Sequence, residues 1–179
     1  KGNSDGTIQS PFCTLAEALR RVPGHIGFNI ELKYPNLKEA LLDELVSPDL
    51  NAYCHAVLAV VHAHAGTRPI TFSSFHPEAV MCMALKQTTY PVLFLTEGGK
   101  DDVWDERGNS LHAAVAWAQR WGLAGIVTAF QPIEEAPYLI GQIRRQGLAC
   151  FTYGTRNNDA PFVAMQRAYG VDAVIVDHV

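Results

Sequence analysis

Short apolar runs rich in β-branched and aromatic residues recur along the chain, and segments with helical periodicity separate them. The apolar runs predict strands over residues 27–32, 70–74, 92–96, 125–128, 149–153 and 173–177. Their near-continuous apolar character is typical of strands buried on both faces. Strands that alternate with helices predict a parallel sheet covered by helices. Six such units fit a doubly wound sheet or part of an eight-stranded barrel, and periodicity alone does not choose between them.

Residues that start and stop helices mark the intervening segments. Thr14 followed by Glu17 is a capping box, and a Pro-Gly pair at 23–24 ends this first helix. A second helical region contains leucines at 37, 41 and 45, and a third covers about residues 52–65. Four later helices are predicted to begin at Pro77, at Ser110 or Asn109, at Pro137 and at Asp159.

Composition narrows the class of protein. The 179 residues suffice for one domain, and 48% hydrophobic with 18% charged residues indicate a folded globular chain. A net charge of -4 without a basic run argues against a nucleic-acid partner. The four widely spaced cysteines are interpreted as buried thiols, and the lack of an N-x-[ST] sequon favours a cytoplasmic protein. No apolar run reaches the roughly 18 residues that a membrane span needs.

The first candidate site lies at the end of the strand predicted over 27–32. Asn29, Glu31 and Lys33 alternate along it and share one face, whereas the apolar residues between them share the other. A carboxylate binds hard divalent cations through oxygen, and an ammonium group holds a phosphate oxygen. This spacing fits a phosphate-ester site at the carboxyl end of a strand. On spacing alone, a structural ion pair at the mouth of the strand is slightly favoured over a functional site.

Other polar residues are weaker candidates. Ser73 and Ser74 end the second strand, where only one of them can face inward, and Asp177 follows the last apolar run. The histidines at 25, 76, 112 and 178 stand isolated in turns or helix starts, and no Ser-His-Asp or Cys-His arrangement is apparent. The acidic cluster at 101, 102, 105 and 106 is interpreted as a solvated loop. No glycine-rich phosphate loop follows any strand.

Five segments, in order, resemble the glycerophosphodiester phosphodiesterase family across essentially all 179 residues. They are Thr14-Leu15-x-Glu17-Ala18-Leu19, Glu31-x-Lys33, Phe72-Ser73-Ser74-Phe75, Cys150-Phe151-Thr152-Tyr153-Gly154 and Gly170-Val171-Asp172-Ala173-Val174-Ile175-Val176-Asp177. The segments at 27–35, 90–96 and 157–159 are similar to the eukaryotic glycerophosphocholine phosphodiesterase branch.

The resemblance implies a (β/α)8 TIM barrel and metal-dependent hydrolysis of a small-molecule glycerophosphodiester to glycerol 3-phosphate and an alcohol. It implies that Glu31 binds a divalent metal ion, Mg or Ca, and that Lys33 contacts the substrate phosphate. Phe151 stands where many members carry a pocket-lining tryptophan, so it keeps an apolar wall but loses the indole donor.

The family's His-Arg pair, its Glu-x-Asp and a further histidine do not appear in the chain. Because the chain begins at Lys1 within a loop-like segment, we expect residues 1–179 to be one incomplete barrel domain whose first two strands, with the acid and base histidines, lie upstream. This piece alone is expected to be inactive, and its open strand edges favour association. The alternative is a non-catalytic phosphate-signalling regulator on the same barrel.

Overall fold

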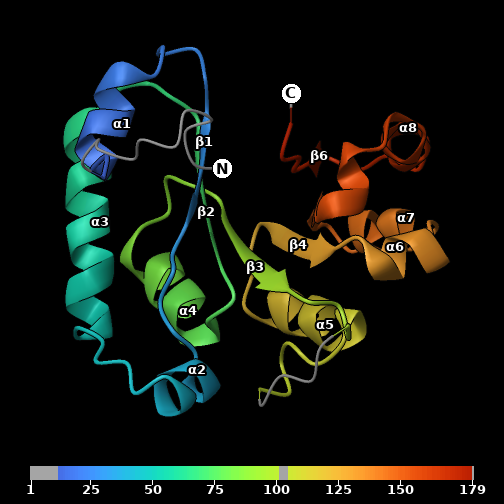
Figure 1. Ribbon diagram of the computed structural model, residues 1–179, viewed down its shortest axis with the longest axis horizontal. Helices are drawn as coiled ribbons and strands as arrows, with labels where there is room; N and C mark the ends of the chain where they lie inside the picture. The colour runs from blue at the N-terminus through green and yellow to red at the C-terminus, as the bar shows by residue number, and fades with distance from the viewer. Residues whose placement is uncertain (1–11, 101–104, 179) are drawn as a thin grey trace, which may run out of the picture.

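Six parallel strands form a single curled sheet in the computed structural model, which describes residues 12–100 and 105–178 (Figure 1). The strands are β1 (Phe28–Glu31), β2 (Ile70–Ser74), β3 (Val92–Thr96), β4 (Gly125–Ala129), β5 (Ala149–Tyr153) and β6 (Ala173–Val174). They lie in sequential order, and each neighbouring pair is parallel. A doubly wound sheet reverses its strand order partway, so this order identifies part of a barrel. The fold prediction is confirmed.

Helices connect successive strands and lie on the outside of the curl (Figure 1). They are α1 (Leu15–Arg21), α2 (Leu37–Leu42), α3 (Leu50–His64), α4 (Pro77–Lys86), α5 (Leu111–Arg120), α6 (Gln131–Glu135), α7 (Leu139–Arg145), the 3-10 helix η1 (Thr155–Asn158) and α8 (Ala160–Ala168). The Thr14–Glu17 capping box forms at α1, and Ser110 caps α5 through the amide of Ala113. Local sequence therefore sets these helix starts.

The two faces of the sheet carry different side chains because residues alternate along each strand. On one face Ile30, Phe72 and Phe94 join a core that includes residues of the covering helices. On the opposite, concave face, Leu93, Leu95 and Val127 form a separate apolar cluster, with Phe151 and Tyr153 packed against it. The concave face is the inside of the curl, and it carries the alternate positions of every strand.

The structure differs from the predicted elements in several places. The second helix ends at Leu42, and Leu45 lies beyond it and is 47% exposed. The helix predicted from Pro137 begins at Leu139, and the short helices α6 and η1 were not predicted. The last strand covers two residues instead of five. Asp159 occupies the N-cap position of α8 but makes no capping bond there, and its carboxylate pairs with Arg156 at 2.9 Å.

The outer strands leave both sides of the sheet open within the described part of the chain. There β1 pairs only with β2, and β6 pairs only with β5. The alternation of β1 shows the effect, because Asn29 and Glu31 on the concave side are exposed whereas Phe28 and Ile30 are half-buried. None of the described helices has the length and apolar character to cross a bilayer.

Candidate functional site at the carboxyl ends of the strands

Glu31 and Lys33 meet at the carboxyl end of β1. The Lys33 ammonium lies 2.7 Å from the Glu31 Oε1, so the predicted shared face is confirmed. The two side chains are 33% exposed for Glu31 and 78% exposed for Lys33. Leu32 between them is buried on the other side. An ion pair this open to water contributes at most about 1 kcal/mol to folding, so stability is a weak reason for its presence.

The end of β2 separates the roles of its two serines. Ser73 is in register with Glu31 and Leu93, so it faces the concave side, where it is 1% exposed. Its Oγ has no hydrogen-bond partner among the described residues. Ser74 faces the helices, donates to the carbonyl of Leu32 at 2.7 Å and accepts from the amide of His76. Ser74 therefore links the chain after β1 to the chain after β2, and Ser73 is the serine whose hydroxyl faces the concave side.

Aromatic side chains close the concave face. The rings of Phe75 and Tyr153 meet edge-to-face with centroids 6.0 Å apart, although β3 and β4 separate their strands. The curl of the sheet brings them together. Gly154 turns the chain directly after β5 with a φ of 116°, and a Cβ there would lie 2.6 Å from the ring of Phe130. Phe151 packs on the same apolar cluster, but it lies on β5, with three strands between it and the Glu31–Lys33 pair.

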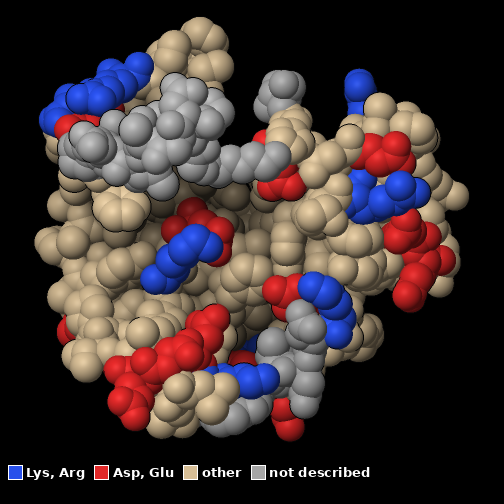
Figure 2. All heavy atoms as spheres, viewed as in Figure 1, with Lys and Arg blue, Asp and Glu red and all other residues tan. Residues whose placement is uncertain are grey.

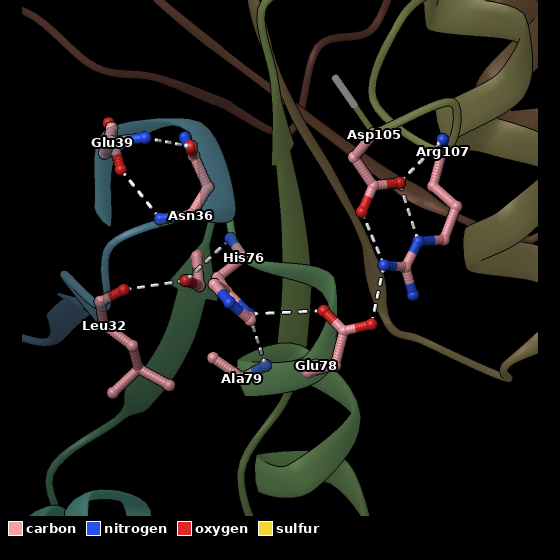
Figure 3. A network of polar contacts seen from close by, with 9 residues as sticks. Leu32, Asn36, Glu39, His76, Glu78, Ala79, Asp105 and Arg107 are labelled. Atoms are coloured by element: carbon pink, nitrogen blue, oxygen red, sulfur yellow. Dashed lines mark hydrogen bonds and ion pairs between the residues drawn. The ribbon is translucent and has the colours of Figure 1, made fainter. Parts of the chain in front are cut away.

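A polar network that the sequence did not predict occupies the rim beside this site (Figure 3). Arg107 donates to both carboxylate oxygens of Asp105 and, at 2.6 Å, to Glu78 at the start of α4. Hydrogen bonds from Arg107 lower the pKa of Asp105, and the same bonds raise the pKa of Arg107. Asp105 is therefore an ion-pair partner and not the solvated loop residue that we expected. Asp101 and Asp102 lie outside the described residues.

His76 belongs to this network and not to an isolated turn. Its Nδ1 accepts a hydrogen bond from the amide of Ala79 and stands 3.4 Å from the Glu78 carboxylate. Burial lowers the pKa of His76, and the neighbouring Glu78 opposes this shift. The neutral ring therefore caps α4, and it pairs with Glu78 only when protonated. The sequence signal for this capping role was Pro77, because proline is common at the first helical position and the residue before that position is the N-cap.

The network lines a cavity of about 680 Å³ at the carboxyl ends of β2 and β3. Residues from α2, from the turn before α4 and from the segment before α5 form its walls. Around this cavity and the concave face, the described residues contain no group of three or more His, Cys, Asp or Glu side chains placed to hold a metal ion. Glu31 is thus a single carboxylate and not a complete metal site.

A curled parallel sheet in sequential order, with polar groups collected at its carboxyl edge, defines part of an α/β barrel of the kind that places active sites at that edge. The chain belongs to the glycerophosphoryl diester phosphodiesterase family, whose model matches residues 2–179. The family that the five segments resembled is therefore confirmed.

Individual relatives place the chain within this family. A glycerophosphocholine phosphodiesterase of Candida albicans is 44% identical over 183 residues, which cover 100% of this chain and 16% of the relative. Two solved structures, each 19% identical, share the fold. A glycerophosphodiester phosphodiesterase of Thermotoga maritima has a TM-score of 0.62, over 92% of this chain and 60% of its own. A phosphodiesterase of Oleispira antarctica, in complex with the product sn-glycerol-3-phosphate, has a TM-score of 0.58, over 85% and 51%.

Proposed function

We propose that this barrel serves the hydrolysis of glycerophosphodiesters to glycerol 3-phosphate and an alcohol. The observation that carries the proposal is the Glu31–Lys33 pair, at 2.7 Å, at the carboxyl end of a strand in a member of this family. The substrate class follows the names of the relatives, one called a glycerophosphocholine phosphodiesterase and another solved with sn-glycerol-3-phosphate. Glycerophosphocholine is therefore the first substrate to test.

Lys33 is proposed as the phosphate contact. Its ammonium is 78% exposed, so it can leave Glu31 and reach a ligand at the mouth at little cost in folding energy. Hydrogen bonds to a charged group contribute about 1.5–3 kcal/mol. Phe151, on the concave apolar cluster, is proposed as part of the wall along which the substrate lies.

A divalent ion, Mg or Ca, is proposed as the cofactor, with Glu31 as one of its ligands. Such an ion polarises a phosphoryl oxygen when bound. Ca²⁺ takes six to eight oxygen ligands and Mg²⁺ takes six, whereas the described residues contain no group of three or more His, Cys, Asp or Glu side chains that could hold such an ion. The described set does not hold the ion by itself. We therefore expect the 179-residue chain to bind product but not to hydrolyse substrate.

Binding of glycerol 3-phosphate tests the phosphate contact. The product is titrated into the 179-residue chain and followed by 31P NMR, with Lys33→Met as the variant and Lys86→Met, at the far end of α4, as the control. We expect Lys33→Met to weaken binding by at least about tenfold, and the control to leave it unchanged. Equal affinity of the wild type and Lys33→Met would overturn the assignment.

Hydrolysis is tested separately. The 179-residue chain and a polypeptide that carries a complete eight-stranded barrel are incubated with glycerophosphocholine and Mg²⁺ or Ca²⁺, and released glycerol 3-phosphate is measured. We expect release only from the complete barrel, and its loss in Glu31→Gln. A complete barrel that binds glycerol 3-phosphate but never releases it from substrate would instead indicate a regulatory domain.

A further inference from the structure

The cavity of about 680 Å³ beside the Glu31–Lys33 pair has no role in the phosphate chemistry described so far. It is lined in part by Phe75 and Leu95. These two residues also belong to the concave face, since Leu95 is in its apolar cluster and Phe75 contacts Tyr153. The cavity is therefore continuous with the mouth of the barrel. Its outer wall begins at Asn36, three residues after Lys33.

The charge of the lining is predominantly negative. Carboxylates come from Glu39, Asp43, Glu78, Glu97 and Asp105, and cationic side chains come from Lys38 and Arg107. Five carboxylates against two cations leave an excess of three negative charges. Acidic side chains also gather over α2 at the lower left of Figure 2.

Among the described residues of the lining, the one arginine already forms ion pairs. Figure 3 shows the Arg107 guanidinium between Asp105 and Glu78, and both ion pairs are short. Arg107 therefore neutralises part of the charge of these two acids, which occupy its Nε and Nη2. Glu97 and Asp43 do not take part in these ion pairs. They add negative charge to the lining from two separate segments, Glu97 directly after β3 and Asp43 directly after α2.

Apolar surface accompanies the charge. Phe75, Phe94, Leu95, Leu42 and Pro77 contribute hydrocarbon to the lining. The volume lies within the range of about 300–1,000 Å³ that is typical of small-ligand sites. A strongly hydrated metal ion gains nothing from hydrocarbon walls, and a phosphate group is repelled by the carboxylates. A cation whose charge is spread over an apolar surface matches both properties of the lining.

We propose that this cavity binds the cationic alcohol half of the substrate, an organic ammonium group such as the trimethylammonium of choline. The assignment rests on the proposed hydrolysis, because it places the phosphate at Lys33 and the alcohol in the adjoining cavity. A trimethylammonium group donates no strong hydrogen bonds, so it requires nearby negative charge and apolar contact in place of acceptors in fixed positions. Phe75 and Leu95 provide the contact, and Glu97 and Asp43 provide the charge.

Free choline tests the subsite without any need for catalysis. It is titrated into the 15N-labelled chain and followed by 1H–15N correlation spectra, in parallel with 3,3-dimethylbutan-1-ol, the uncharged carbon analogue of choline. We expect choline to shift amides in segments 36–43, 75–78, 95–97 and 105–108, and the analogue to leave them in place. Ethanolamine in a third titration separates a preference for quaternary ammonium from binding of any ammonium group.

Charge-removing variants complete the test. The double variant Asp43→Asn with Glu97→Gln is expected to weaken choline binding by about tenfold. Glu135→Gln, which removes one exposed carboxylate outside the lining, is expected to leave it unchanged. The spectra also report whether each variant is folded. Equal binding of choline and its uncharged analogue, unchanged affinity in the double variant, or shifts confined to other segments would each overturn the proposal.

The Lys33→Met variant distinguishes failure of this subsite from failure of the proposed function. It should bind choline as the wild type does and lose glycerol 3-phosphate. Choline binding without any binding of glycerol 3-phosphate to the wild type would refute the phosphate site alone. Glycerol 3-phosphate binding without choline binding would refute the cavity assignment alone.

Discussion

Arg68 connects the first helix to the second strand, and its removal should cost a large part of the stability of the fold. Its guanidinium is buried, at 6% residue exposure, and donates to four carbonyl oxygens. The acceptors, at 2.5 to 3.0 Å, are the carbonyls of Leu19, Val22, Pro23 and Ile26, at and after the end of α1. The same group stacks over the Phe28 ring at 4.7 Å. Arg68 thus holds together residues up to 49 positions apart in the sequence.

The magnitude follows from these four bonds. A hydrogen bond within a protein contributes a net value of about 1 kcal/mol, which gives about 4 kcal/mol for Arg68→Met. The carbonyls of Pro23 and Ile26 belong to exposed residues and regain water, so we expect about 3 kcal/mol. For a chain of this size, that loss corresponds to a decrease in Tm of roughly 6–12 °C. Arg68→Lys keeps the charge with fewer bonds and should lose about half as much.

Urea unfolding followed by far-UV circular dichroism measures these losses directly. The matched control is Arg167→Met, which removes an exposed arginine of α8 and should change the free energy of unfolding by less than about 0.5 kcal/mol. A loss below about 1 kcal/mol for Arg68→Met would refute the reasoning, because it would mean that water replaces all four bonds at no cost.

Three further predictions concern buried polar groups. Ser73→Ala removes a buried hydroxyl that has no partner among the described residues, so the free energy of unfolding measured by urea titration should rise by about 1 kcal/mol. A decrease of that size would contradict this prediction. Burial raises the pKa of Cys54 and of Cys150 to about 12. At pH 8 a thiol-reactive dye should therefore label the exposed Cys13 before either of them, which peptide mass spectrometry measures. Rapid labelling of Cys150 would be inconsistent with the fold. Burial lowers the pKa of His76 below the ordinary histidine value, so the unfolded chain binds this proton more readily and stability falls as the pH drops through about 6.5. His76→Asn, which can still cap α4, should flatten the curve of stability against pH in that window, and an unchanged slope would exclude the effect.

Much of this protein could be predicted without a structure because the signals are local. Apolar runs located all six strands, and the alternation of side chains placed Glu31 and Lys33 on one face. The Thr14–Glu17 box involves only neighbouring residues and forms as predicted. Short segments in a fixed order also indicated the family that the family model confirms. These signals depend only on neighbouring residues and on composition, so they can be read from the sequence before the packing of the elements is known.

The remaining features depend on contacts between segments that are distant in the sequence. Alternation permits one of two serines to face inward, but only the register with Glu31 selects Ser73. His76 and Asp105 looked unrelated in sequence, and Arg107 links their segments across 29 residues through Glu78. The rim cavity exists because the curl of the sheet and the outer helices place these segments around one space. Packing between elements decides such contacts, and no local pattern encodes it. The sequence by itself therefore determined the location of the strands, several helix starts and the family, and the tertiary structure decided which side chains surround the candidate site.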